Sequence, residues 1–198
     1  MMTTTPFNAL PICKDETDFR LNKDEFDFIL NKTEYRDSKS FSGGVLLSKD
    51  TDVLRHEPMS RTKKFIIDKI LDYRDNILQI EDDLGMTQSW STINHKGNNH
   101  HEHNHPNTLI SCVYYAQASS GDFVIKTPNS RLQEGFNLSY KLKQQNIFNS
   151  NAWSCEVKDG VLIIFPGHLN HFSLPNENDE SRIMIGANFF LKEIRKVL

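Results

Sequence analysis

The most constraining feature of this chain is a dense histidine segment near its middle, N-H-K-G-N-N-H-H-E-H-N-H-P-N, which runs from Asn94 to Asn107. It holds five of the eight histidines in the sequence. Another histidine, His171, lies far downstream in F-P-G-H-L-N-H, and Arg182 follows it. Imidazole is the commonest protein ligand for divalent transition metals, and a His-x-His pair on an extended strand directs both rings to one face. The pattern therefore predicts a metal site with two neighbouring ligands and a distant one.

The surroundings of the segment bear on this interpretation. A histidine-rich tract can also be a solvated loop that binds metals adventitiously. Directly downstream, however, L-I-S-C-V-Y-Y-A (109–116) is apolar, β-branched and aromatic, which is typical of a buried strand. Two close ligands that lead into a core strand, a distant ligand and a following arginine indicate a non-haem iron site with an anionic co-substrate.

Length and composition limit the number of domains, the kinds of partner and the cellular compartment. A chain of 198 residues fits one domain with a substantial core. The net charge of −3 and the pI of about 6.2 give no electrostatic footprint for duplex nucleic acid. Three scattered cysteines, Cys13, Cys112 and Cys155, predict free thiols in a reducing compartment. With no signal-peptide pattern and no apolar run near the roughly 20 residues that span a bilayer, we expect a soluble cytoplasmic protein.

The periodicity predicts an α-plus-β front followed by an all-β body. We expect a modest amphipathic helix over 15–32, a short strand at 45–47, and a stronger helix from about Ser60 to Gln79, with Ser60 as N-cap and a stripe of Ile66, Ile70, Tyr73 and Ile77. Strands are predicted from Gln88 to Asn94 and at 109–116, 123–126, 153–157, 161–166 and 182–191. The polar segment 128–151 is predicted to be an insertion or flap.

The alternation within the last strand predicts two different faces. Ile183, Ile185, Ala187 and Phe189 form an apolar face suited to packing, whereas Arg182, Met184, Gly186 and Asn188 form a face suited to a cavity. An arginine that faces such a cavity needs an anion, and a dicarboxylate accepts its bidentate fork. An ordinary buried arginine–carboxylate pair is the alternative.

An ordered series of motifs resembles the Fe(II)- and 2-oxoglutarate-dependent oxygenases, and within them a branch found in bacteria and phages. The series covers roughly residues 38–190: a tryptophan strand with Trp90 and Asn94, then H-x-H-P at 103–106, then 111–115, F-P through His171 at 165–171, and Arg182 through Asn188. The resemblance implies a double-stranded β-helix, or jelly roll, mainly β with flanking N-terminal helices on the outside. It implies a single oxygenase-like domain over 1–198, with an α-containing part at about 1–85 and a β-helix body at about 86–191.

The resemblance also implies a ligand set. His103, His105 and His171 would bind Fe(II), and Arg182, Tyr115, Ser111 and Asn94 would hold 2-oxoglutarate, with no catalytic residue beyond the metal ligands. The branch has a serine two residues after its arginine, where this chain has Met184, so one hydroxyl that could assist the co-substrate carboxylate is missing. His100 with Glu102, or His101 with His103, remain alternative first ligands.

Two other function classes stay open at this point. A zinc hydrolase or lyase uses a similar histidine triad but leaves Arg182 unexplained. A cupin-like metal-binding module without turnover is the other, since a fold does not fix function. We expect a small-molecule or peptide substrate, no nucleic-acid or membrane partner, and an oligomeric state that the sequence leaves undetermined, a homodimer being compatible.

Overall fold

The computed structural model describes residues 10–37, 43–126 and 141–193, and it consists mainly of two antiparallel β-sheets. A seven-stranded sheet has the order β1-β8-β5-β10-β4-β3-β2, and a three-stranded sheet has the order β7-β6-β9. The large sheet contains β1 (Cys13–Glu16), β2 (Tyr35–Asp37), β3 (Leu46–Ser48), β4 (Leu84–Asn94), β5 (Ile110–Gln117), β8 (Val161–Pro166) and β10 (Arg182–Leu191). The small sheet contains β6 (Phe123–Lys126), β7 (Ala152–Cys155) and β9 (Asn170–Ser173).

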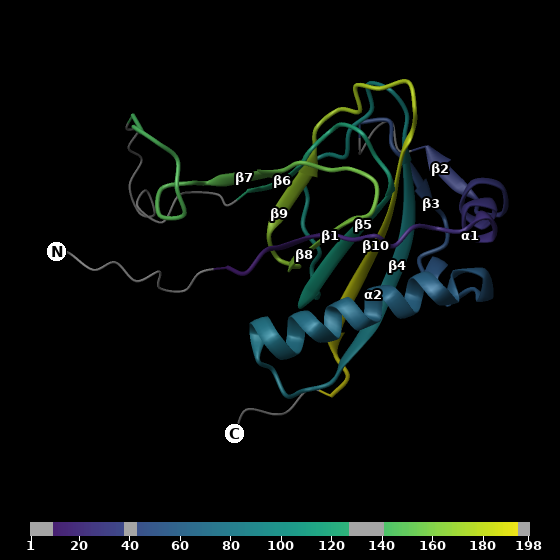
Figure 1. Ribbon diagram of the computed structural model, residues 1–198, viewed down its shortest axis with the longest axis horizontal. Helices are drawn as coiled ribbons and strands as arrows, with labels where there is room; N and C mark the ends of the chain where they lie inside the picture. Colours follow the sequence, from purple (N-terminus) through teal and green to yellow (C-terminus); the bar gives the residue numbers. More distant parts are fainter. Residues whose placement is uncertain (1–9, 38–42, 127–140, 194–198) are drawn as a thin grey trace.

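Two α-helices, α1 (Lys23–Asp27) and α2 (Ser60–Asp72), belong to the described part of the N-terminal half. Figure 1 shows α2 lying across the strands of the large sheet. Its buried Ile66 and Ile70 share one apolar core with the outward residues of the sheet, among them Tyr114, Ile183 and Ile185. The expectation of a mainly β protein with helices on the outside is confirmed.

The ends of α2 differ from the prediction. Its N-cap is Met59, the last residue of a 3₁₀ turn at Glu57–Met59, so Ser60 is already helical. At the other end the chain continues as a π-helix from Tyr73 to Leu78. A π-helix bonds residue i to i+5, so the residue above Tyr73 is Leu78 rather than Ile77. Leu78 accordingly packs against the core, whereas Ile77 is exposed.

The single helix predicted over 15–32 is wrong in its first part. Residues Cys13–Glu16 form β1, which pairs with β8 at the edge of the large sheet. Helix α1 begins after Asn22, whose side chain accepts a hydrogen bond from Glu25 N while Glu25 accepts one from Asn22 N. This reciprocal capping fixes the helix start. The other oxygen of Glu25 is buried and accepts from the backbone and hydroxyl of Thr62, which joins α1 to α2.

The two faces predicted for the last strand are confirmed. Ile183, Ile185, Ala187 and Phe189 belong to the core under the helices. Met184 belongs instead to a second core, between the sheets, with Tyr115, Phe123 and Phe165. The second face of β10, with the polar residues of β4 and β5 beside it, therefore points into the space between the two sheets.

Most predicted strands agree with the structure within a few residues, and β10 agrees at both ends. The structure adds β2 and β9, which were not predicted from the sequence. Of the predicted insertion at 128–151, residues up to 140 lie outside the described residues. The described remainder, 141–151, is mostly exposed and leads into β7 from beyond its outer end (Figure 1). Among the described residues, no helix has the length and apolar character needed to cross a bilayer.

Candidate metal centre

The histidine segment is held along β9 by backbone hydrogen bonds. His103 and His171 exchange two of them, at 3.0 and 2.8 Å, in an antiparallel bridge. His105 N donates to Gly167 O at 2.9 Å. Directly opposed residues of an antiparallel pair present their side chains on the same face. The segment thus acts as a further strand beside β9 and brings the predicted distant ligand next to the close pair.

The three predicted ligands converge. One ring nitrogen from each of His103, His105 and His171 lies within 4.8 Å of the other two. His171 is buried, and the other two are partly buried. Burial, followed by the neighbouring His103, lowers the pKa of His105 and of His171 to about 3, and burial lowers the pKa of His103 as well. All three rings are therefore neutral at neutral pH, which is the form that binds metals.

Backbone carbonyls orient two of the rings. His171 Nδ1 lies 2.9 Å from Leu169 O, and His103 Nδ1 lies 2.8 Å from His101 O. A carbonyl oxygen only accepts hydrogen bonds, so Nδ1 carries the proton in both rings and Nε2 presents its lone pair. Such contacts fix the tautomer and orientation of metal-binding histidines. Three neutral imidazoles suit iron, zinc, nickel or copper better than magnesium or calcium.

A pocket between the two sheets opens beside these rings. It has an empty volume of about 450 Å³, part of it open to solvent, and the three histidines line it together with Trp90, Thr92, Tyr115, Phe123, Ser173, Met184 and Gly186. The Trp90 ring lies 5.2 Å from the His105 ring. A Cβ on Gly186 would come within 2.4 Å of the Trp90 ring, so glycine at 186 makes room for the indole. The walls are largely apolar and aromatic, as is usual for small-molecule sites.

Polar atoms without partners gather on the side of the pocket toward Arg182. Thr92 Oγ1, Tyr115 Oη, Arg182 Nε and both amide atoms of Asn94 are buried without a hydrogen-bond partner. In the sheet register Asn94 is opposite Arg182, while Thr92 and Tyr115 are both opposite Met184. Buried polar groups nearly always have partners, so a cluster of exceptions needs an explanation such as a bound ligand. Burial raises the pKa of Tyr115, so its hydroxyl stays protonated and can donate to an anion.

Arg182 is almost completely buried, with 1% of the residue's surface exposed. Its Nη1 donates to the carbonyls of Ser120, Gly121 and Leu174, and its Nη2 donates to Ser173 Oγ at 2.7 Å. All four acceptors are neutral. The guanidinium thus retains an unmatched positive charge, with Nε free, rather than forming the buried arginine–carboxylate pair that the sequence left open. Burial lowers its pKa, and nearby Tyr115 and Asp122 oppose that effect.

Gly121 is a residue that the sequence analysis missed. Its backbone has φ of +80°, and a Cβ there would lie 1.8 Å from Arg182 Nη1. Only a glycine allows both this backbone conformation and the close approach of the guanidinium. The turn between β5 and β6 therefore helps to hold Arg182.

Ser111 lies apart from this group. Its hydroxyl donates to Asn188 Oδ1 at 2.7 Å, and in the register it is opposite Asn188, six residues along β10 from Arg182. At about 3.4 Å per residue this separation is about 20 Å, too far for both to contact one end of a small dicarboxylate. The expectation that Ser111 assists Arg182 has no support in this geometry.

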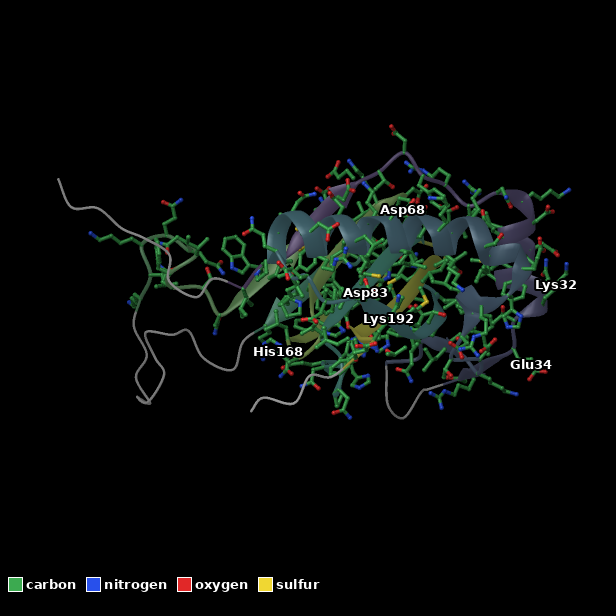
Figure 2. The ribbon with its side chains drawn as sticks, turned by 90° about the horizontal axis from the view of Figure 1, so that it is seen from below. Lys32, Glu34, Asp68, Asp83, His168 and Lys192 are labelled. Atoms are coloured by element: carbon green, nitrogen blue, oxygen red, sulfur yellow. The ribbon has the colours of Figure 1, made fainter. Side chains whose placement is uncertain are left out.

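The alternative ligands have different surroundings. Glu102 binds Lys126 Nζ at 3.1 Å and Asn170 Nδ2 at 3.2 Å, and it belongs to neither of the two metal-capable groups found among the described residues. His100 and His101 do belong to one, together with His103. His100 also lines the pocket, and burial, followed by His103, lowers its pKa to about 3. His168, in contrast, lies exposed at the surface (Figure 2).

The sequence matches the model of a protein family described as "Putative 2OG-Fe(II) oxygenase" over residues 88–188, a range that contains all three histidines, Arg182 and the polar cluster. The chain belongs to this family of 2-oxoglutarate- and Fe(II)-dependent oxygenases. It is accordingly an oxygenase that uses Fe(II) and 2-oxoglutarate. Family membership favours this activity over the zinc hydrolase and over the module without turnover. No curated protein matches the chain.

Solved structures share the fold. A prolyl-4-hydroxylase from Pseudomonas putida has a TM-score of 0.62 at 11% identity, with 93% of this chain and 94% of that chain covered. HygX from Streptomyces hygroscopicus, with nickel and 2-oxoglutarate bound, has a TM-score of 0.64 at 12% identity, with 94% and 85% covered. A prolyl hydroxylase from Trichoplax adhaerens, in complex with a hypoxia-inducible-factor peptide fragment, has a TM-score of 0.61 at 13% identity, with 93% and 84% covered. At these identities the likeness concerns the fold.

Proposed function

We propose that His103, His105 and His171 hold the Fe(II) of this oxygenase and that Arg182, Tyr115, Thr92 and Asn94 receive the far carboxylate of 2-oxoglutarate. The observation that carries the proposal is the coincidence of two features around one pocket. Three neutral imidazoles converge on one side of it. A cluster of buried polar atoms without partners lies on the side toward Arg182. We further propose that the two facing sheets form a double-stranded β-helix.

The spacing of the two features supports the assignment. Gly186 lies at the Trp90 end of the pocket, and Arg182 is four residues along the same strand, about 13 Å away at the usual rise. Tyr115 and Thr92 are opposite Met184, midway between them. An elongated dicarboxylate, with its keto-acid end toward the histidines and its other end toward Arg182, matches this row. The Tyr115 and Thr92 hydroxyls also offset the missing serine at position 184.

When bound, Fe(II) supplies the oxygen chemistry that couples oxidative decarboxylation of 2-oxoglutarate to oxidation of a substrate. The chain's own residues orient the metal-binding imidazoles, bind the anionic co-substrate and exclude water. The carbonyls of Leu169 and His101 hold two imidazoles in the metal-binding tautomer. Arg182 provides a fixed positive charge in a site whose surroundings are largely dry, where it attracts an anion more strongly than in water. Trp90 and Phe123 restrict water around the histidines.

The pocket also bears on the substrate. Trp153 is opposite Ile125 in β6, which is in turn opposite His171 in β9, so all three side chains share a face of the small sheet. Trp153 is 45% exposed. An exposed indole on the same sheet face as a metal ligand offers an apolar contact to a substrate. We therefore propose that the substrate is a small molecule or a peptide with an apolar group near the oxidised position.

The test is a turnover assay in the absence of a known substrate. Purified protein loaded anaerobically with Fe(II) is given 2-oxoglutarate and dioxygen, and succinate is measured. Oxygen-dependent succinate formation that the His171→Ala variant loses and the His168→Ala variant keeps supports the proposal. Iron bound without any stabilisation of the protein by 2-oxoglutarate would contradict the assignment of Arg182 and Tyr115.

A further inference from the structure

A second group of three histidines lies beside the first. Ring nitrogens of His100, His101 and His103 fall within 4.8 Å of one another. The His100 and His103 ring centroids are 4.3 Å apart, those of His101 and His103 are 5.1 Å apart, and those of His100 and His101 are 5.3 Å apart. His101 is exposed and the other two are partly buried, so this outer group faces solvent more than the inner group of His103, His105 and His171.

The outer group is part of the folded structure rather than a loose tract. His100 N donates to Ser173 Oγ at 2.9 Å, and Ser173 N donates to His100 O at 3.2 Å. His103 is held by its own backbone pair with His171. These contacts fix both ends of the four-residue stretch that carries the rings. The intervening Glu102 is held by Lys126 and Asn170, so its carboxylate is engaged elsewhere.

The two groups share one residue, and that residue has one free nitrogen. His103 Nδ1 donates to His101 O, which leaves only Nε2 to bind a metal. One lone pair binds one ion. A metal at the outer group therefore removes a ligand from the inner group, and a metal at the inner group leaves the outer group with two ligands.

We propose that His100, His101 and His103 form a second metal site, which binds zinc, nickel or copper and whose occupation excludes a metal from the inner site. The donors are three imidazoles with no carboxylate, a set that these metals favour. The affinity of a given nitrogen site rises from Fe²⁺ through Ni²⁺ to Cu²⁺, and Zn²⁺ also exceeds Fe²⁺. The outer site thus captures the stronger-binding metals at the surface and, through His103, makes iron loading sensitive to them.

Zinc binding to tag-free full-length protein tests the proposal without iron chemistry or turnover. His105→Ala leaves the inner group with two ligands and the outer group complete. His101→Ala does the reverse, at an exposed position. We expect each single variant to bind one zinc ion. Adding His101→Ala to His105→Ala breaks both groups, and we expect the zinc affinity to fall at least about tenfold relative to His105→Ala alone. The wild type should bind one equivalent at this locus, because His103 is shared.

Controls separate the outer site from adventitious binding. His168→Ala removes another exposed histidine outside both groups, so adding it to His105→Ala should leave the zinc affinity unchanged. His105→Asn provides the same comparison with a polar side chain retained, if the alanine variant fails to fold. The proposal is overturned if adding His101→Ala to His105→Ala leaves the zinc affinity unchanged. Two zinc equivalents bound at once by His100, His101, His103, His105 and His171 in the wild type would overturn the exclusion. Neither result would touch the assignment of the inner site, which depends on iron and 2-oxoglutarate.

Discussion

Asn94 and Arg182 lie directly opposite each other in the β4–β10 register, and each keeps a buried polar side-chain atom without a partner. The sheet thus places an amide beside a guanidinium at the end of a row that also contains Tyr115 and Thr92. An isolated buried polar group without a partner costs roughly 1–3 kcal/mol. The rest of the fold must offset the free-energy cost of a group of such atoms. A ligand that completes their hydrogen bonds would explain why the group is there.

Tyr115→Phe should separate stability from binding. The substitution removes a buried hydroxyl that has no partner in the protein, so the unliganded variant should be as stable as the wild type or more stable by about 1 kcal/mol. The same hydroxyl is proposed to donate to a carboxylate, so the affinity for 2-oxoglutarate should fall about tenfold or more. Urea unfolding with and without 2-oxoglutarate measures both quantities. If the unliganded variant is less stable than the wild type and its affinity for 2-oxoglutarate is unchanged, the hydroxyl has a structural role.

His103→Ala and His171→Ala should each lower Fe(II) occupancy at least about tenfold after anaerobic reconstitution, because each removes one of three ligands. The fold should persist, since the core beneath the helices contains neither residue. Iron content and circular dichroism check the two expectations. His168→Ala is the matched control, an exposed histidine three residues before His171. Unchanged iron content in His171→Ala would exclude this ligand set.

The features that could be predicted from the sequence are those marked by a two-residue alternation or by a short motif. The two faces of β10 follow from alternation alone, and they separate the residues under the helices from those facing the pocket. The His-x-His pair and His171 converge because the segment pairs with β9, although β9 itself was not predicted. Its four residues, N-H-F-S, are too few to show a period. The π-helix after α2 was equally invisible, because one extra residue per turn leaves little trace in composition.

The surroundings of Arg182 could not be predicted for a different reason. Its acceptors come from the turn at Ser120 and Gly121 and from Leu174, two segments far apart in the sequence. Nothing in a backbone carbonyl marks it as a partner of a distant arginine. Thr92 was likewise predicted only as part of a strand, since the absence of a partner for its hydroxyl is visible only once the sheets are assembled.

These contacts change what substitution of Arg182 should do. The sequence alone predicts that Arg182→Met raises the KM for 2-oxoglutarate while the fold survives. In the structure, methionine would leave three carbonyls and the Ser173 hydroxyl without this donor, so we expect a loss of more than about 3 kcal/mol in the free energy of unfolding. Arg182→Lys should retain the charge and part of the bonding. Its stability should be intermediate, with a KM for 2-oxoglutarate raised about tenfold or more. A KM equal to that of the wild type in a folded Arg182→Lys protein would assign Arg182 to the fold alone.

Gly121→Ala, compared with Gly97→Ala, should test whether the turn at 121 supports the co-substrate site. Both glycines have φ near +80°, so alanine introduces a similar backbone strain of about 1–2 kcal/mol at each. A Cβ at 97 meets nothing within 4 Å, whereas a Cβ at 121 would overlap Arg182 Nη1. Gly97→Ala should therefore lose only that strain energy and bind 2-oxoglutarate normally. Gly121→Ala should displace the guanidinium and weaken 2-oxoglutarate binding in addition, while iron binding at the histidines stays unchanged. Thermal unfolding and calorimetric titration of the two variants provide the comparison. Equal losses in both would mean that the turn contributes its backbone conformation and not the position of Arg182.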